Sequence, residues 1–271
     1  MAAVAASQVA MAAIVKSPVA MAAMWRSDTA IKALQANATA WKTFTGATSA
    51  VMGKTVAILA NLDPSGYADM TAIASSQVAM TAVAASQVAM AAVAASQVAM
   101  AAIQKSQTAL NAIAASSMAT AKYAAGAAGL NPADYADMTA IASSQVAMAA
   151  IAGSGKARVA ITNSSVALAA LASSPLKKSV STSAYNGNYA KLVTNGPCFI
   201  ISATHNNSGW TFGVRYVYTS ETASGAKTYS STGSAQSINL FTTSAGLEAF
   251  ANADSSASGQ VTFVYIPCKA A

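Results

Sequence analysis

The sequence has few charged side chains. Lys and Arg number 15, Asp and Glu number 8, and together they make up only 8% of the 271 residues, against roughly a quarter in an ordinary soluble domain. Aromatic residues are also scarce, at 7%, although 54% of the chain is hydrophobic and much of that fraction is alanine. Because alanine buries little area per residue, a compact enzyme core is not expected. The high hydrophobic fraction also argues against an intrinsically disordered chain.

Residues that usually carry catalysis or bind metals are nearly missing. The one histidine, His205, lies in a predicted polar loop, so a single chain has no multi-histidine site. A trimer could gather three copies of His205 around a metal, but a surface or packed loop histidine is favoured. Glu221, Glu248 and Asp254, the acidic residues after position 177, show no spacing that singles out a glycosidase pair. We therefore expect no enzymatic activity, no cofactor and no resident metal.

Long apolar runs are also missing. Ser or Gln returns every few positions, so no stretch of about 18 apolar residues is available for a transmembrane helix. The first residues, Met1 to Val4, lack the basic segment of a signal peptide. Basic residues such as Lys16, Arg26 and Lys32 are dispersed along the chain, whereas a nucleic-acid interface gathers them. We expect no membrane insertion and no nucleic-acid partner.

A ten-residue repeat dominates the first two-thirds of the chain. Its form is M-x-A-[VI]-x-x-S-x-x-A, and it is most regular over residues 80–109. It restarts twice after a spacer of the form L-[DN]-P-x-x-Y-A-D, and the identical string MTAIASSQVAM follows both spacers. The chain therefore divides into repeats at 1–61, a spacer at 62–69, repeats at 70–129, a spacer at 130–137, repeats at 138–177 and a C-terminal module at 178–271.

The repeat composition of Ala, Met and Gln favours helix, but the period does not fit one straight helix. Ten residues fall about 80° short of three full turns, so the helix is either overwound or interrupted once per repeat. The seventh repeat position holds Ser or Asn, which are preferred at helix N-caps, and Pro18 and Pro175 follow two of these residues. We favour short helices of about two turns over a continuous helix with small serines at an interface. Ala47 and Ala57 break the rule. The predicted N-caps are Ser7, Ser17, Ser27, Asn37, Ser76, Ser86, Ser96, Ser106, Ser116, Ser144, Ser154, Ser164 and Ser174.

Each predicted helix is apolar on more than one face. The Met and the Val or Ile three residues later share one face, and the Val two residues after the Ser lies on the far side. Such helices are normally buried on more than one side. We therefore expect most of residues 1–176 to be buried against other chains in a homo-oligomeric rod, with the spacers as corners. Asp63-Pro64 and Asn131-Pro132 in the spacers are typical of an N-cap followed by Pro at the first helical position.

The composition changes near Lys177. All 12 Met residues precede position 149, and after position 177 hydrophobic and polar residues alternate as they do in strands. Strands are predicted at 198–202, 210–218, 237–242 and 261–266, and a short helix at 247–252. The strand residues expected to be buried are Phe212, Tyr216, Phe263 and Tyr265. About five to seven short strands predict a small β-sandwich or jelly-roll module. The predicted fold class is thus α+β in separate domains.

The ten-residue repeats, the L-[DN]-P-x-x-Y-A-D spacer ahead of MTAIASSQVAM and the terminal β module resemble tail-fibre and related appendage proteins of tailed bacteriophages. The repeats carry the resemblance over about residues 1–176, and the C-terminal module matches by placement and strand content. The resemblance implies a homotrimeric structural rod of the virion, assembled in the host cytoplasm. Its tip would contact other virion proteins or a bacterial surface glycan or outer-membrane protein. Because the repeats begin at Met1, with no separate anchoring domain ahead of them, collar, neck and head fibres are open beside tail fibres. The alternative is a structural brace or decoration protein whose β module docks on the neck or capsid.

Two sets of residues in the β module carry specific expectations. Carbohydrate recognition commonly uses exposed aromatic rings beside amide groups, and loops are where such residues gather. For each candidate, packing in the core or at a trimer interface is the alternative. Cys198 and Cys268 could form one disulfide if their strands are neighbours, but the reducing cytoplasm implied by the resemblance favours buried free thiols. The receptor-binding candidates are Tyr185, Asn186, Asn188, Tyr189, His205, Asn206, Asn207, Trp210 and Tyr229.

Overall fold

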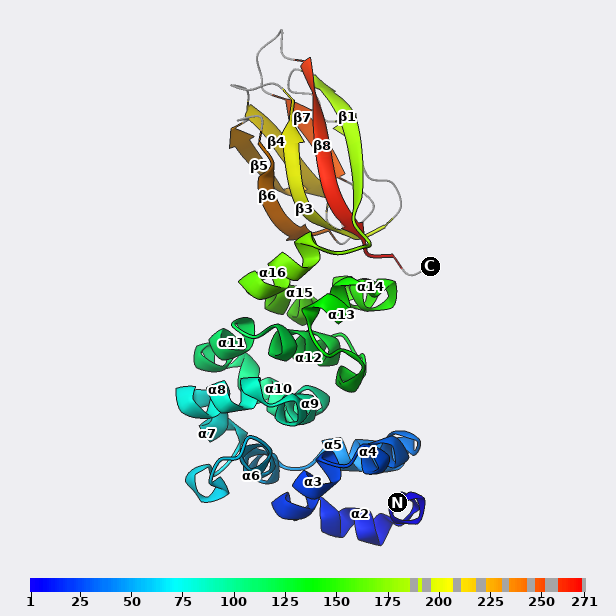
Figure 1. Ribbon diagram of the computed structural model, residues 1–271, viewed down its shortest axis with the longest axis vertical. Helices are drawn as coiled ribbons and strands as arrows, with labels where there is room; N and C mark the ends of the chain where they lie inside the picture. Colours follow the sequence, from blue (N-terminus) through cyan, green and yellow to red (C-terminus); the bar gives the residue numbers. More distant parts are fainter. Residues whose placement is uncertain are drawn as a thin grey trace. The chain divides into compact units, whose positions relative to one another are not determined.

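Short helices fill the first two-thirds of the chain and antiparallel strands fill the last third (Figure 1). The fold class is therefore α+β, as predicted. The computed structural model describes residues 1–185, 190–191, 196–206, 211–217, 223–230, 234–242, 247–251 and 258–269. The chain divides into two compact units: unit 1 is residues 1–138 with 163–167, and unit 2 is residues 139–162 with 168–271. Unit 2 thus combines helices of the third repeat block with the β module.

The helices are 5 to 11 residues long. Those before the first spacer are α1 (Ala2–Ala6), α2 (Gln8–Ile14), α3 (Pro18–Trp25), α4 (Asp28–Gln35), α5 (Ala38–Thr45) and α6 (Ser49–Leu59). The first spacer holds the 3₁₀ turn η1 (Pro64–Gly66), followed by α7 (Met70–Ser75), α8 (Gln77–Ala85), α9 (Gln87–Ala95), α10 (Gln97–Gln104), α11 (Gln107–Ala114) and α12 (Ser117–Ala127). The second spacer holds η2 (Pro132–Asp134), followed by α13 (Met138–Ala142), α14 (Gln145–Gly153), α15 (Gly155–Thr162) and α16 (Ser165–Ala172).

The residue at the seventh repeat position begins a new helix. The Ser7 side chain accepts a hydrogen bond from the Ala10 N–H at 3.2 Å, which satisfies one of the unpaired donors of the first helical turn. Successive helices bend sharply at these caps, by 105° between α2 and α3 and by 103° between α8 and α9. The helix is therefore interrupted, and the continuous-helix alternative is wrong. The same capping bond, to the N–H three residues on, is made by Ser17, Ser27, Asn37, Ser76, Ser86, Ser96, Ser106, Ser116, Ser144, Ser154 and Ser164.

Ser174 does not begin a helix, contrary to prediction. Its hydroxyl oxygen accepts from the Leu176 N–H at 3.0 Å, but a turn follows and strand β1 starts at Lys178. The strand starts too soon for a helical turn to form. The repeat with Ala47 at the seventh position begins its helix in another way. Thr48 caps α6 through the Val51 N–H, so α6 starts one residue later than the repeat pattern predicts.

Within unit 1, helices three apart in the chain stack on one another: α7 on α10, α8 on α11 and α9 on α12 (Figure 1). The capping side chains also join these turns. The Ser116 hydroxyl donates to the Ala84 carbonyl oxygen at 3.3 Å, and the Asn37 amide donates to the Ala5 carbonyl oxygen at 3.3 Å. In both cases the acceptor lies 32 residues earlier. That interval is close to the one a bend of 103° per helix requires for a closed turn.

Stacking of the turns buries the apolar face of the repeat inside one chain. Met80, Val83 and Met90 are fully buried. The Val on the predicted far side is exposed, with Val9 at 83% and Val78 at 72% exposure. Burial of the Met, and of the Val or Ile three residues after it, therefore needs no other chain, contrary to the expectation from the sequence. The bend at each Ser brings the chain's own next turn onto a face that a straight helix would leave open.

The two spacers form the same corner. α6 and α12 each end before a residue with left-handed backbone, Asn61 with φ 58° and Gly129 with φ 76°, which Asn and Gly tolerate best. The next N–H, of Leu62 or Leu130, returns to a carbonyl of the last helical turn at 2.8 or 2.9 Å. This closes the helix end in the manner of a Schellman motif.

The residue before each spacer proline caps the 3₁₀ turn that follows, as predicted. Asp63 accepts from the Ser65 N–H at 2.9 Å, and Asn131 accepts from the Ala133 N–H at 3.2 Å. The backbone and hydroxyl hydrogen bonds from Ser65 lower the pKa of the Asp63 carboxyl group. Each spacer is therefore a locally satisfied turn.

The second corner also contains a buried lysine. Lys122 in α12 is only 1% exposed, and its ammonium donates to the carbonyl oxygens of Pro132 at 2.9 Å and Tyr135 at 3.0 Å. Burial lowers the pKa of Lys122, and the nearby Asp134 carboxylate opposes that shift. The residue at the same place in the first corner, Lys54, is exposed. The two corners thus share a backbone but differ in the burial of this lysine.

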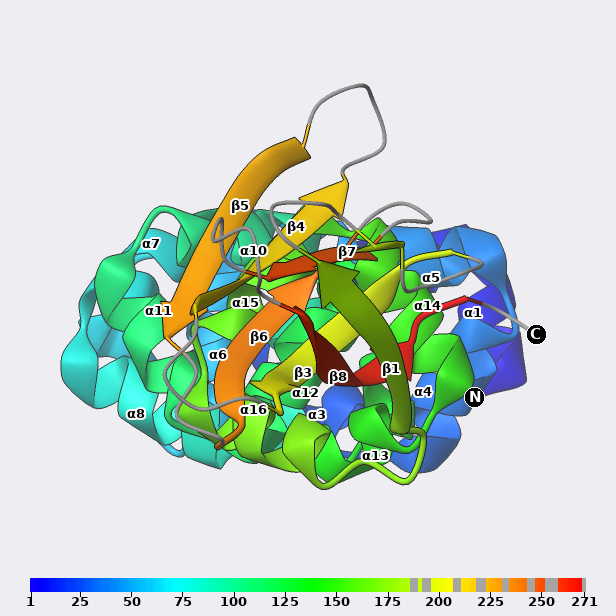
Figure 2. The same ribbon diagram turned by 90° about the horizontal axis from the view of Figure 1, so that it is seen from above.

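The strands of unit 2 form two four-stranded antiparallel sheets, with orders β1-β8-β3-β6 and β2-β7-β4-β5 (Figure 2). Every connection except β4 to β5 passes from one sheet to the other, which is the connectivity of an eight-stranded jelly roll. The strands are β1 (Lys178–Tyr185), β2 (Ala190–Lys191), β3 (Cys198–His205), β4 (Thr211–Val217), β5 (Ala223–Ser230), β6 (Gln236–Phe241), β7 (Leu247–Ala251) and β8 (Ser258–Pro267).

Four of these strands match the strand predictions, and one overturns a prediction. The segment expected to be a helix at 247–252 is instead β7, which pairs with β4 and β2. Phe263 is fully buried, as predicted, whereas Tyr265 is half-buried. Phe212 and Tyr216 lie in β4, but their side chains are outside the described part of the structure.

One end of the β module packs on helices of its own unit. Gln145 in α14 donates from Nε2 to the carbonyl oxygens of Pro267 at 2.8 Å and Lys269 at 2.7 Å. α14 contacts β8, and α15 contacts β6. We call this end, where β8 finishes and β3 begins, the base of the module.

Candidate functional site

The end of the β module opposite the base is the candidate site, and we call it the distal end. β1 finishes there at Tyr185, which is paired with the first residue of β8, Ser258. β3 also finishes there, with His205 opposite Val261. β8 has 10 residues, so the distal end lies about 30 Å along the strand from the Gln145 contacts, at roughly 3.3 Å per residue.

Chain connectivity gathers four inter-strand segments at the distal end. They join β1 to β2, β3 to β4, β5 to β6 and β7 to β8, and the strand ends on either side of each segment are at this end. Every receptor-binding candidate from the sequence belongs to a strand end or a segment of this set. Tyr185 ends β1, and Tyr229 is the next-to-last residue of β5, but neither side chain is among the described ones. Asn186, Asn188, Tyr189, Asn207 and Trp210 lie outside the described residues.

His205 is a strand residue and not a loop residue, contrary to prediction. It is the last residue of β3 and is fully buried, on the strand face that also buries Ile201 and Ala203. Its ring packs so closely on Gly259 of β8 that a Cβ added to that glycine would overlap it. His205 therefore supports the distal end from inside and is removed from the contact candidates.

Asn206 is exposed, but part of its bonding capacity is spent within the fold. Its N–H donates to the Gln260 carbonyl oxygen at 3.1 Å, and its Oδ1 accepts from the Gln260 N–H at 2.9 Å. These two bonds close the edge between β3 and β8. Asn206 is best described as a residue that positions the start of the β3–β4 segment.

Exposed polar residues at the distal end that the sequence analysis missed are Ser183, Ser237 and Gln260. Ser183 and Gln260 are directly opposite each other across β1 and β8. The period-two pattern of β8 was the available signal, because Val261 and Phe263 are buried and Gln260 falls on the other face. Hydroxyl and amide groups thus line the described part of this end.

The sequence has almost no charged residues in the segments that connect the strands at the distal end. The segments 186–189, 206–210, 231–235 and 252–257 contain one ionisable acidic residue, Asp254, and no Lys or Arg. Amide, hydroxyl and aromatic groups remain. Such groups bind uncharged polar surfaces through hydrogen bonds and ring stacking, whereas ionic ligands need compensating charge.

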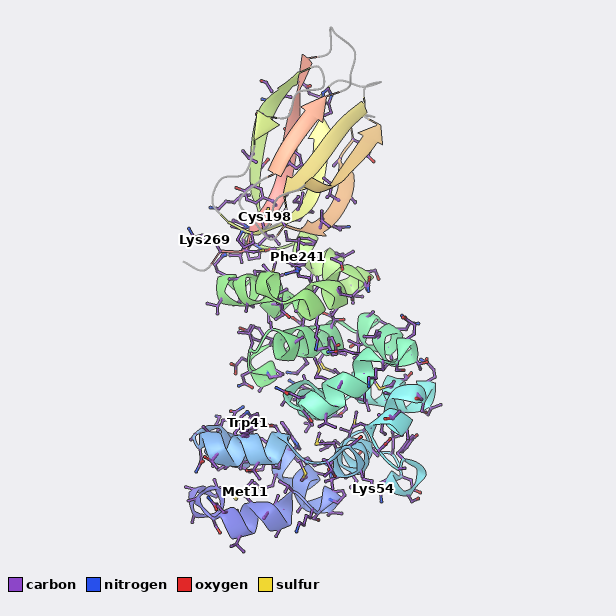
Figure 3. All side chains as sticks on the ribbon, turned by 180° about the vertical axis from the view of Figure 1, so that it is seen from behind. Met11, Trp41, Lys54, Cys198, Phe241 and Lys269 are labelled. Carbon is purple, nitrogen blue, oxygen red and sulfur yellow. The ribbon has the colours of Figure 1, made fainter. Side chains whose placement is uncertain are left out.

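Cys198, the first residue of β3, lies at the base (Figure 3), and Cys268 directly follows the last residue of β8 at the same end. Cys198 and Cys268 are buried and free, as predicted. The Cys198 Sγ is 3.3 Å from the Thr242 Oγ1, and burial raises the pKa of Cys198 to about 11. Burial, with a contribution from Cys198, raises the pKa of Cys268 further above its usual range. A thiol that stays protonated is a poor nucleophile, so these groups serve packing.

The described residues include no cluster suited to a metal ion and no single helix suited to a membrane span. No group of three or more His, Cys, Asp or Glu side chains in the described ranges is placed to hold a metal ion. In the same ranges, no single helix is both long and apolar enough to cross a membrane, although two helix pairs bent at a break pass by length and composition.

Comparison with known proteins adds no relative. A scan against models of protein families finds no match, and a search of curated proteins finds none either.

Proposed function

We propose that the chain is a non-enzymatic structural fibre protein of a tailed-bacteriophage virion, in the tail or the collar. In this proposal the stacked helices act as a spacer, and the distal end of the β module contacts the host surface. The observation that carries the proposal is the gathering of the inter-strand segments at the end opposite the Gln145 contacts. An end that is not needed to hold the module on its helices is available for a partner.

The chemistry of the distal end supports a neutral polar partner. The described side chains there, such as Ser183, Ser237 and Gln260, are exposed and uncharged. The candidates Tyr189 and Trp210 belong to segments that start or finish at this end. Aromatic rings with amide neighbours suit the faces and hydroxyl groups of sugars. We therefore propose a bacterial surface glycan as the contact, with an outer-membrane protein as the other candidate partner.

The proposed oligomer is a homotrimer, and its support is the resemblance to phage fibres. Intrachain burial of Met80 and Val83 means that trimer contacts need not supply the core of the repeats. Analytical ultracentrifugation of the full chain measures the oligomeric state directly. A stable monomer at micromolar concentration would contradict the trimer while leaving the surface contact open to its own test.

Binding of the fluorescently labelled full chain to host cells tests the contact. Trp210→Ala is expected to weaken whole-cell binding at least tenfold, since loss of a stacking ring at an interface centre is costly. The matched control is Tyr67→Ala, which removes a half-exposed aromatic ring from the first spacer and should leave binding unchanged. Equal binding by both variants and the unaltered chain would contradict a host-contact role.

The second candidate function is a brace or decoration protein whose β module docks on the neck or capsid. It is favoured by the same exposed residues of the distal end, since that surface could equally bind another virion protein. A particle reconstruction separates the two functions. Density for residues 178–271 against the particle would support the brace, and density projecting from it would support the host-contact fibre.

A further inference from the structure

Contacts within unit 1 are short-ranged along the chain. In the block between the spacers, each helix packs on its chain neighbours and on the helix one turn later, as α8 packs on α9 and α11. In folds of this kind, stability is a sum of local terms, and parts of the stack can open without the rest. α1 packs on α4 and α3 packs on α6 in the same way, so unit 1 has the architecture of a coil whose turns are separable units.

Hydrogen bonds of one repeated kind connect these turns. The Ser106 hydroxyl donates to the Ala74 carbonyl oxygen at 2.5 Å, and the Ser116 hydroxyl donates to the Ala84 carbonyl oxygen at 3.3 Å. Both acceptors belong to the last turn of a helix, where carbonyls lack intrahelical partners. Around these bonds the interface consists of small side chains such as Ala79 and Ala89 with Met80 and Met90. The turn-to-turn hydrogen bonds of Ser106 and Ser116 are thus modest contacts of one kind.

The second corner is held by contacts of a different kind. Gly126 of α12 lies so close to the Ala94 carbonyl of α9 that a Cβ at that position would overlap the oxygen. Tyr123, next to the buried Lys122, is 2% exposed. Lys122 itself ties α12 to η2 through two carbonyls. Opening this corner would expose the Tyr123 ring and break both Lys122 hydrogen bonds, losses that add to those of opening a turn of Ala, Met and Val side chains.

We propose that unit 1 is an extensible element that opens turn by turn under tension and recoils when the tension is released. The stacked turns open first, and the corner at α12 opens last. One turn of 32 residues releases about 110 Å of chain at roughly 3.5 Å per residue. This mechanical role goes beyond the proposed fibre function and does not depend on any particular host contact.

Optical-tweezers stretching of the full chain, held at its two ends, tests the proposal. Unit 1 should give several small reversible extensions of about 110 Å of contour each, separate from the larger event in which the β module unfolds. A single event that releases all of unit 1 at once would overturn the proposal. Extensions that do not reverse on relaxation would also overturn it.

Variants at the capping serines identify the bond that resists the force. Ser106→Asp keeps an acceptor for the helix cap but cannot donate to the Ala74 carbonyl, so the first extension should occur at a clearly lower force. Ser106→Asn should restore the force, because Asn37 already makes both bonds. Ser76→Asp is the matched control, since Ser76 caps α8 and no turn-to-turn bond from its hydroxyl occurs among the described residues. An equal fall in force for Ser106→Asp and Ser76→Asp would contradict the assigned bond.

Discussion

The Ser106 hydroxyl joins two turns of helix at once. It donates to the Ala74 carbonyl oxygen, 32 residues earlier, while its oxygen accepts from the N–H at the start of its own helix, α11. A hydroxyl has one donor and two acceptor sites, so one small side chain can do both. Ala can do neither, and Asp can only accept. Ser116 and Asn37 also make both bonds, so at these positions the choice of Ser or Asn follows from a double requirement.

Ser106→Asp should destabilise the chain by about 1–3 kcal/mol, the cost of leaving a buried carbonyl without its donor. Ala74 is only 1% exposed, so water cannot readily replace the hydroxyl. Urea unfolding followed by far-UV circular dichroism measures the change. Ser106→Asn should stay within about 0.5 kcal/mol of the unaltered chain, as surface-like substitutions do. A loss as large for Asn as for Asp would show that the turn-to-turn bond contributes nothing.

Lys122→Met should destabilise unit 1 by about 2–4 kcal/mol, because it leaves the buried Pro132 carbonyl oxygen and the part-buried Tyr135 carbonyl oxygen without a donor. Lys54→Met is the matched control, since Lys54 occupies the same place in the first corner but is exposed. That variant should change stability by less than about 0.5 kcal/mol. Hydrogen exchange should show faster exchange in η2 for the Lys122 variant alone. Equal effects of the two variants would contradict a corner held by Lys122.

The helices and their caps could be predicted because the signals are local. The pair Ser17-Pro18 predicts the start of a helix, and Ser17 is the N-cap of α3 in the structure. The direction of the bend at each cap is not local, because it depends on which face the next turn covers. The 32-residue interval between Ser106 and Ala74 does not appear in a ten-residue period. Without this interval, the apolar face of the repeat is expected to be covered by other chains and not by the chain's own next turn.

The β module shows the same division between local and distant information. Leu247, Glu248 and Ala249 are good helix formers, yet they form β7, because pairing with β4 and β2 on both sides outweighs a weak propensity. His205 precedes Asn206 and Asn207, and this polar run predicts a loop at His205. The buried alternation of Ile201, Ala203 and His205 was the signal that extended the strand. The order of the strands in the two sheets brings the ends of distant strands together at the candidate site, and that order cannot be inferred from local sequence patterns.

Gly126→Ala should destabilise unit 1 by about 1–3 kcal/mol, the usual cost of forcing extra volume into a packed interface. The Cβ would overlap the Ala94 carbonyl oxygen, which belongs to backbone and cannot rotate away. Gly153→Ala is the control, because a Cβ at Gly153 meets nothing within 4 Å. That helical position should gain up to about 1 kcal/mol from the higher helix propensity of Ala. Thermal unfolding of both variants gives the comparison, and a stabilised Gly126 variant would show that α9 and α12 are not closely packed.

Stability should fall as the pH rises from about 9 to about 11, and the two buried thiols should account for a measurable part of the fall. Burial raises the pKa of Cys198 from 9.0 to about 11, so in this range the unfolded thiol has lost its proton while the folded thiol still holds it. Because the folded state then binds more protons, stability decreases with pH. The raised pKa of Cys268 acts in the same direction. Each pH unit across the window costs up to about 1.4 kcal/mol per thiol.

The double variant Cys198→Ala with Cys268→Ala removes this contribution, together with the effect of the Cys198 charge on the pKa of Tyr265. Its stability at neutral pH should be lower, because the substitutions leave small cavities in the base. Between pH 9 and 11, however, its urea midpoint should fall less steeply than that of the unaltered chain. Tyr123 and Lys122 titrate identically in both proteins, so they cancel in the difference between the two curves. Parallel curves over the whole range would mean that the thiols ionise as easily in the folded chain as in the unfolded one.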